Sequence, residues 1–131
     1  MKDILILDDE QTVRQSFVDF FEDQMWQTVQ AKSGEEALEL LEKGAHPKAA
    51  IVDIRLPGMD GDAFIREVCS RKYVMSIVVC TGSPEYEIPD DLKALLCVSN
   101  RVFRKPVADF NALEVELIST ANNMMKEAGS E

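Results

Sequence analysis

Four short apolar runs of this chain each lead into a residue that could take part in phosphoryl chemistry. The runs cover residues 4–7, 49–52, 77–80 and 101–104. The residues that follow or end them are, in chain order, Asp8 and Asp9, Asp53, Thr81, and Lys105. Three carboxylates, a hydroxyl and an ammonium gathered in one place would suit a divalent cation and a phosphoryl group.

The runs also indicate how these residues could meet. They are short, rich in β-branched residues and separated by helix-length segments, which is typical of buried strands in a parallel sheet. Ligands of such sheets bind outside the carboxyl ends of the strands. We therefore expect the four sets to converge at one edge of the sheet.

Helix-length segments with one apolar stripe fill the intervals. Apolar spacing predicts a first helix after Asp9, and a capping box at residues 33–36 predicts a second that stops at Gly44. The expected apolar stripes comprise Val13, Phe17, Phe20 and Phe21, then Leu38 and Leu41, then Phe64, Val68 and Cys69, and finally Phe110, Leu113, Leu117, Ile118 and Ala121. Residues 25–31 alternate weakly and predict a strand, with Trp26 in a packing role. Pro84 and Pro89 leave only residues 90–96 for the fourth helix.

Together these patterns predict five strands and five helices in alternation, which is typical of an α/β fold. Right-handed crossovers would wind it into a flavodoxin-like three-layer α/β/α sandwich, a parallel sheet in the order 2-1-3-4-5. The order reverses between strands one and three, so Asp8, Asp9 and Asp53 would flank that crevice. We expect one domain over residues 1–126 and a polar tail over residues 127–131.

Composition narrows the function classes. The chain has 131 residues and a formal net charge of −10, which repels nucleic acid and anionic lipid. It contains no apolar stretch near membrane-span length and no secretory h-region, so we expect a cytoplasmic protein with neither nucleic-acid nor membrane partners. Cys69, Cys80 and Cys97 are odd in number and form no CxxC pair, which favours reduced, packed thiols over a disulfide framework or a zinc site.

In order and spacing, these signatures resemble the receiver domain of two-component response regulators over nearly the whole chain. The matching segments are Asp8-Asp9-Glu10, Asp53 to Gly61, Thr81-Gly82 and Arg104-Lys105-Pro106. Each is unspecific alone, and an Asp pair after a strand is by itself more often a helix cap. All four in order are strong evidence.

The resemblance implies specific roles. Asp53 would accept a phosphoryl group from a sensor histidine kinase or histidine phosphotransfer protein and lose it later by hydrolysis, switching a downstream effector. Mg²⁺ (or Mn²⁺) would be held by Asp9, Asp53 and the backbone carbonyl of Arg55, with Asp8 acting through water. Thr81 and Lys105 would contact the phosphoryl oxygens, and the bond before Pro106 would be cis.

The sequence departs from the family pattern at positions that affect the lifetime of the phosphoryl group and the transmission of the signal. Arg55 and Ser83, with Gly82 beside the latter, flank the expected phosphoryl position, and we hypothesise that Arg55 alters the approach of water. An ordinary surface ion pair explains Arg55 about as well. Where receivers usually carry an aromatic switch residue the chain has Val102, with Phe103 next to it, so that switch would be absent or relocated.

Two other functions stay open at this point. An aspartyl phosphohydrolase would need a carboxylic acid two residues after its nucleophile, where Arg55 stands. A receiver-like scaffold could instead bind partners without phosphorylation. A flavin site is weaker, since the loop after the first strand is acidic and lacks phosphate donors. We favour a signalling module that acts only on its own Asp53, rather than a turnover enzyme.

Overall fold

The computed structural model describes residues 2–128, which form five strands and five helices in strict alternation. The strands are β1 (Asp3–Leu7), β2 (Gln27–Ala31), β3 (Ala49–Val52), β4 (Ser76–Thr81) and β5 (Val98–Arg104). The helices are α1 (Gln11–Asp23), α2 (Gly34–Glu42), α3 (Gly61–Ser70), α4 (Asp90–Lys93) and α5 (Phe110–Ala128).

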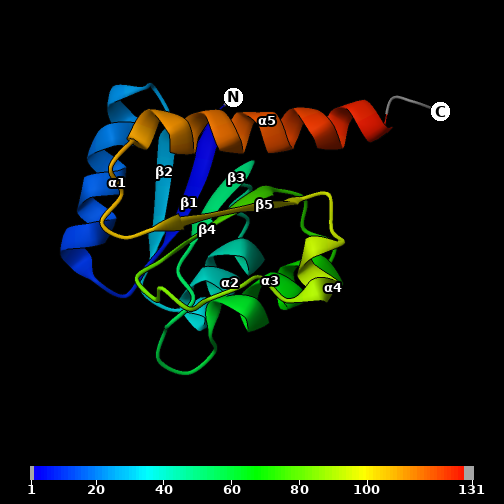
Figure 1. Ribbon diagram of the computed structural model, residues 1–131, viewed down its shortest axis with the longest axis horizontal. Helices are drawn as coiled ribbons and strands as arrows, with labels where there is room; N and C mark the ends of the chain where they lie inside the picture. The colour runs from blue at the N-terminus through cyan, green and yellow to red at the C-terminus, as the bar shows by residue number, and fades with distance from the viewer. Residues whose placement is uncertain (1, 129–131) are drawn as a thin grey trace.

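All strand pairs are parallel, and the sheet order is β2-β1-β3-β4-β5, which confirms the predicted fold class and topology. Helices α1 and α5 cover one face of the sheet, and α2, α3 and α4 cover the other (Figure 1). Because all the strands are parallel, the carboxyl ends of the four predicted strands lie at the same edge of the sheet.

The two faces of β1 show why the central strands are apolar throughout. Ile4 and Ile6 face the core shared with α1 and α5, whereas Leu5 and Leu7 face the core shared with α2, α3 and α4. Since successive side chains of a strand point to opposite faces, a strand covered on both sides needs apolar residues at every position. Helix α1 contributes Phe17 and Phe21, both fully buried, to the first core.

The start of α2 follows the predicted capping pattern with one difference. The Ser33 hydroxyl accepts a hydrogen bond from the backbone N–H of Glu36 at 3.1 Å, as expected of an N-cap. The Glu36 carboxylate, however, accepts from the N–H of Lys32 at 3.0 Å instead of from Ser33. The chain leaves the helix at Gly44, whose φ of 107° only glycine adopts without strain.

Strand β2 begins two residues later than predicted. Met25 has a φ of 70° and an 84% exposed side chain, so it belongs to the turn that follows α1 and lies outside the strand. Trp26 is buried, as expected of a packing residue, and its indole N–H donates to the Glu114 carboxylate at 2.7 Å.

The segment from α4 to β5 also differs from the prediction. Helix α4 ends at Lys93, short of residue 96, and β5 begins at Val98, three residues before the expected start. Residues 99–101 are polar, so the apolar pattern of the sequence did not indicate the start of this strand.

Helix α5 is longer than expected, since it continues through residues 127 and 128 of the predicted tail. Leu113 and Leu117 are fully buried, whereas Ile118 is 38% exposed. Residue 118 lies about 100° around the helix from residue 117, which places it off the buried stripe. None of the helices within residues 2–128 is long and apolar enough to cross a membrane.

Candidate functional site

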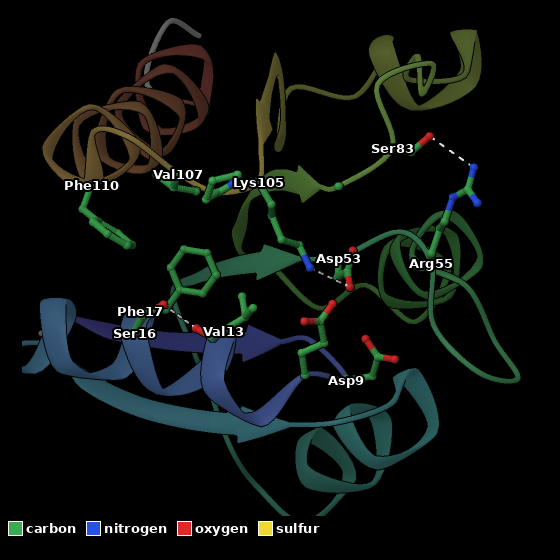
Figure 2. Close-up of a pocket in the computed structure, with 13 residues that line it drawn as sticks. Asp9, Val13, Ser16, Phe17, Asp53, Arg55, Ser83, Lys105, Val107 and Phe110 are labelled. Atoms are coloured by element: carbon green, nitrogen blue, oxygen red, sulfur yellow. Dashed lines mark hydrogen bonds and ion pairs between the residues drawn. The ribbon is translucent and has the colours of Figure 1, made fainter.

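The site lies at the carboxyl edge of the sheet, where the parallel register aligns the ends of the central strands. Leu7 pairs with Val52 in neighbouring strands, so Asp8 and Asp53 leave the sheet side by side. Lys105, which follows β5, reaches toward Asp53 (Figure 2). Its ammonium donates to Asp8 Oδ2 at 2.7 Å and to Asp53 Oδ2 at 3.1 Å. Three residues remote in sequence therefore share one ion-paired centre.

Asp53 is the central carboxylate of this arrangement. It is 4% exposed, and its Oδ1 accepts the backbone N–H of Ile54 at 2.8 Å. Burial raises the pKa of Asp53, the nearby Asp8 raises it further, and Lys105 partly offsets both effects. The carboxylate is thus held in a fixed orientation at a point where its negative charge is costly and depends on a cation.

Lys105 supplies that cation. Burial alone would lower its pKa, but the hydrogen bonds and charges of Asp8 and Asp53 outweigh this effect, and the pKa is raised overall. The side chain is 13% exposed. An ammonium therefore stays in place at neutral pH, between the two carboxylates and next to the open part of the site.

The carboxylates that lie close together differ from the expected metal ligands. Asp8, Asp9 and Glu10 have carboxylate oxygens within 4.8 Å of one another, whereas Asp53 lies outside this group of the described residues. Asp53 is paired instead with the Lys105 ammonium, which also binds Asp8. Glu10 was not predicted as a site residue, although its place directly after two aspartates was the available signal.

Thr81 and Ser83 are both buried at the end of β4. The Thr81 hydroxyl accepts the backbone N–H of Ser83 at 3.1 Å, which shapes the turn after the strand. The Ser83 hydroxyl in turn accepts from the Arg55 guanidinium at 3.2 Å (Figure 2). Arg55 therefore links the loop after β3 to the loop after β4, across the rim of the site.

An open hollow of about 580 Å³ adjoins this centre and extends between α1 and the start of α5. Its polar lining comprises the charged side chains of Asp9, Glu10, Asp53, Arg55 and Lys105, with Gly82 and Ser83, and Ser16 lies beside Val13 and Phe17. Its apolar half is lined by Val13, Phe17, Pro106, Val107 and Phe110. Asp53 thus lines a space that a group from outside can enter, even though little of its own surface is exposed.

Arg104 fixes the loop after β4, a role that sequence reasoning missed. Its guanidinium donates to the backbone carbonyls of Ser83 at 2.6 Å and Tyr86 at 2.9 Å. Tyr86 is anchored further by a hydrogen bond from its hydroxyl to Asp62 of α3 at 2.6 Å. The loop that contains Gly82 and Ser83 is therefore tied to both β5 and α3.

The candidate switch residues of β5 lie on opposite faces of the sheet. Val102 packs against the core of α2, α3 and α4, whereas Phe103 belongs to the core of α1 and α5. The Arg101 guanidinium lies 4.5 Å from the centroid of the Phe103 ring. Phe103 therefore does not replace an aromatic side chain on the face where Val102 stands. The peptide bond before Pro106 is cis, as expected.

The family model described as "Response regulator receiver domain" matches residues 4–118. Curated relatives include regulatory protein AtoC of Escherichia coli (strain K12), 34% identical over 88% of this chain, and Regulator of RpoS of the same organism, 35% identical over 86%. The chain spans only 24% and 32% of the lengths of those two proteins. Sporulation initiation phosphotransferase F of Bacillus subtilis (strain 168) is 28% identical over 79% of this chain and 81% of its own length.

Solved structures show the same fold. Response regulator protein TrrA of Thermotoga maritima, in complex with Mg²⁺-BeF, has a TM-score of 0.75 and 26% identity over 92% of this chain and 99% of its own. The N-terminal domain of a response regulator/sensory box/GGDEF protein of Carboxydothermus hydrogenoformans has a TM-score of 0.81 at 20% identity, over 97% of this chain and 99% of its own.

Proposed function

The chain belongs to the response regulator receiver domain family, and from this premise we propose that it is the phosphoacceptor module of a two-component phosphorelay. One observation carries the proposal: the buried Asp53 carboxylate faces an open hollow with the Lys105 ammonium 3.1 Å away. A nucleophile and a cation for the phosphoryl oxygens are then in place before any donor arrives.

In the proposed transfer, a carboxylate oxygen of Asp53 attacks the phosphorus of a phosphohistidine. The P–N bond to the donor imidazole breaks, and its electron pair returns to the imidazole. Lys105 holds negative charge on the phosphoryl oxygens, and the loop that contains Gly82 and Ser83 borders the same space. Later, water attacks the phosphorus, the bond to Asp53 breaks, and inorganic phosphate leaves.

Residues present at the site fit a divalent cation. The carboxylates of Asp8, Asp9 and Glu10 form a compact set of hard oxygen ligands. Within residues 2–128, the side chains of Asp9 and Glu10 take part in none of the ion pairs. When bound, Mg²⁺ (or Mn²⁺) would neutralise charge on the phosphoryl oxygens. The Mg²⁺-BeF complex of the TrrA neighbour supports this choice of cation.

This function makes the chain a signalling module that acts on its own Asp53 and is not a turnover enzyme. An aspartyl phosphohydrolase is less favoured because Arg55, which bonds to Ser83, occupies the place of its general acid. We propose a sensor histidine kinase or histidine phosphotransfer protein as donor, an effector domain or protein as the receiver of the signal, and the cytoplasm as the compartment. The greater length of AtoC and Regulator of RpoS supports the presence of effector domains in such proteins.

Intact-mass measurement of the full chain with Mg²⁺ and acetyl phosphate tests the proposal. Wild type is expected to gain one phosphoryl group, and Asp53→Asn is expected to gain none because the nucleophilic oxygen is lost. Asp23→Asn, which changes an exposed carboxylate on α1, is the matched control and should be labelled like wild type. Equal labelling of Asp53→Asn and wild type would contradict the assignment of Asp53 as phosphoacceptor. No labelling of any variant would favour a receiver-like scaffold that works without phosphorylation. Steady release of phosphate from small phosphomonoesters would favour an aspartyl phosphohydrolase.

Arg55→Ala is expected to shorten the lifetime of the phosphorylated state. The variant loses the bond between the two rim loops, so water should reach the phosphorus more easily. A barrier change of about 1 kcal/mol corresponds to roughly fivefold faster hydrolysis. The decay of the phosphorylated mass after donor removal measures this, with Lys43→Ala, on the exposed surface of the molecule, as the control. Equal lifetimes for Arg55→Ala and wild type would show that Arg55 makes only a surface contact.

A further inference from the structure

Two of the three cysteines, 28 positions apart in sequence, meet in space. The Sγ atoms of Cys69 and Cys97 lie 3.8 Å apart. Cys69 is at the end of α3, and Cys97 immediately precedes β5. Both residues are partly exposed, unlike Cys80, which is 1% exposed. The proposed phosphorelay function uses neither of them.

Backbone hydrogen bonds fix both cysteines. The Cys69 carbonyl accepts the N–H of Lys72 at 3.1 Å, and the Cys97 carbonyl accepts the N–H of Ile77 at 2.7 Å. The first bond belongs to the turn that ends α3, and the second joins the start of β4 to the start of β5. The approach of the two sulfurs therefore follows from the fold and not from a free loop.

We propose that Cys69 and Cys97 form a modification site, a dithiol that a small disulfide such as glutathione disulfide converts reversibly into an intramolecular disulfide. The sulfurs are at contact distance, and a bond of about 2.0 Å requires them to close by roughly 1.8 Å. The site does not depend on the phosphorylation of Asp53.

Either sulfur can donate to the other across this contact, and we take Cys97 as the thiol that attacks first. The hydrogen bond with Cys69 lowers the pKa of the Cys97 thiol and raises that of the Cys69 thiol, as expected when Cys69 S–H donates to a Cys97 thiolate. The Cys97 thiolate attacks one sulfur of glutathione disulfide and expels one glutathione thiolate. Cys69 then loses its proton and attacks the Cys97 sulfur, which expels the second. Two thiols of the chain are oxidised, and one glutathione disulfide is reduced to two glutathione molecules.

The position of the disulfide gives it a consequence for the fold. The segment between the two cysteines contains β4, the loop with Ser83, and α4. Helices α3 and α4 lie on the same face of the sheet (Figure 1). A bond between residues 69 and 97 would tie the two ends of this segment, so oxidation should restrict its movement and raise the Tm.

The test uses the folded full chain, glutathione disulfide and mass spectrometry after alkylation of the remaining thiols. Wild type should lose two hydrogens, keep one thiol that is alkylated only after unfolding, and regain three thiols with dithiothreitol. Trypsin should then release peptide 67–71 linked to peptide 94–101, while Cys80 remains in the unlinked peptide 73–93. Cys69→Ser should instead retain glutathione on Cys97, because the resolving thiol is missing.

Three results would overturn the proposal. In the first, wild type keeps all three thiols at a concentration of glutathione disulfide that oxidises an exposed cysteine of a reference peptide. In the second, glutathione stays bound to Cys97. In the third, the disulfide includes Cys80. The peptide map of wild type gives the answer even if Cys69→Ser does not fold.

Discussion

Lys105→Met is expected to destabilise the fold by about 3 kcal/mol at pH 7, because it leaves Asp8 and Asp53 buried without their shared cation. Methionine matches the length of the lysine stem and keeps its packing, so the change reports on the charge. The same variant should incorporate little phosphoryl group from acetyl phosphate, since the ammonium that would hold the phosphoryl oxygens is gone. Urea unfolding and intact mass measure the two effects.

The pH dependence of this loss has a definite sign. Without Lys105, burial and the neighbouring Asp8 raise the folded-state pKa of Asp53 further. A carboxyl whose pKa is raised in the folded state loses stability as pH rises from its unfolded value of about 3.9 toward its folded value. The deficit of Lys105→Met relative to wild type should therefore shrink as pH falls toward about 4.

Lys43→Met serves as the matched control for this prediction. Lys43 and Glu39 form an exposed pair one helical turn apart, and solvent screens such a pair so that it contributes little to stability. Its loss should change stability little at either pH. If Lys105→Met is no less stable than Lys43→Met at pH 7, the charge of Lys105 is not what holds the two carboxylates in place.

The site was predictable from sequence to the extent that it depends on strand ends. Asp8, Asp53 and Lys105 meet because parallel strands in the order 2-1-3-4-5 end at one edge, and the apolar runs before these residues already indicated the strands. The pattern could identify the participants, but not which side chains bond to one another. That choice depends on side-chain reach, and Lys105 takes the position between Asp8 and Asp53.

The features that could not be predicted from the sequence occur where the chain has no regular apolar periodicity. Arg104 binds two carbonyls of the loop after β4, and nothing in the spacing of an arginine indicates a backbone partner 18 or 21 residues away. The meeting of Cys69 and Cys97 depends on where a helix ends and a strand begins, which are the least regular positions of both elements. The polar start of β5 likewise lacked the apolar signal that identified the other strands.

Gly61→Ala should disturb the segment that carries Asp53 more than its helical position suggests. Gly61 is the first residue of α3, where replacing glycine by alanine gains at most about 1 kcal/mol, the value for a helix interior. A Cβ at this position, however, would lie 2.8 Å from Ile54 Cα and against the carbonyl of Asp53, both backbone atoms that cannot rotate away. Overpacking of this kind costs up to about 3 kcal/mol, so the steric effect outweighs the propensity gain and a net loss of about 2 kcal/mol is expected.

The same clash should slow the proposed phosphorylation, because the N–H of Gly61 donates to the Ile54 carbonyl at 2.9 Å and any shift moves the residue next to Asp53. A displacement of the Asp53 carboxylate by a fraction of an ångström should slow labelling by roughly tenfold. Gly82→Ala is the stability control, since a Cβ there meets nothing within 4 Å. Urea unfolding of both variants and the labelling rate of Gly61→Ala measure the two effects. Equal stability of the two alanine variants would mean that the loop after β3 moves at little cost and does not fix the position of Asp53.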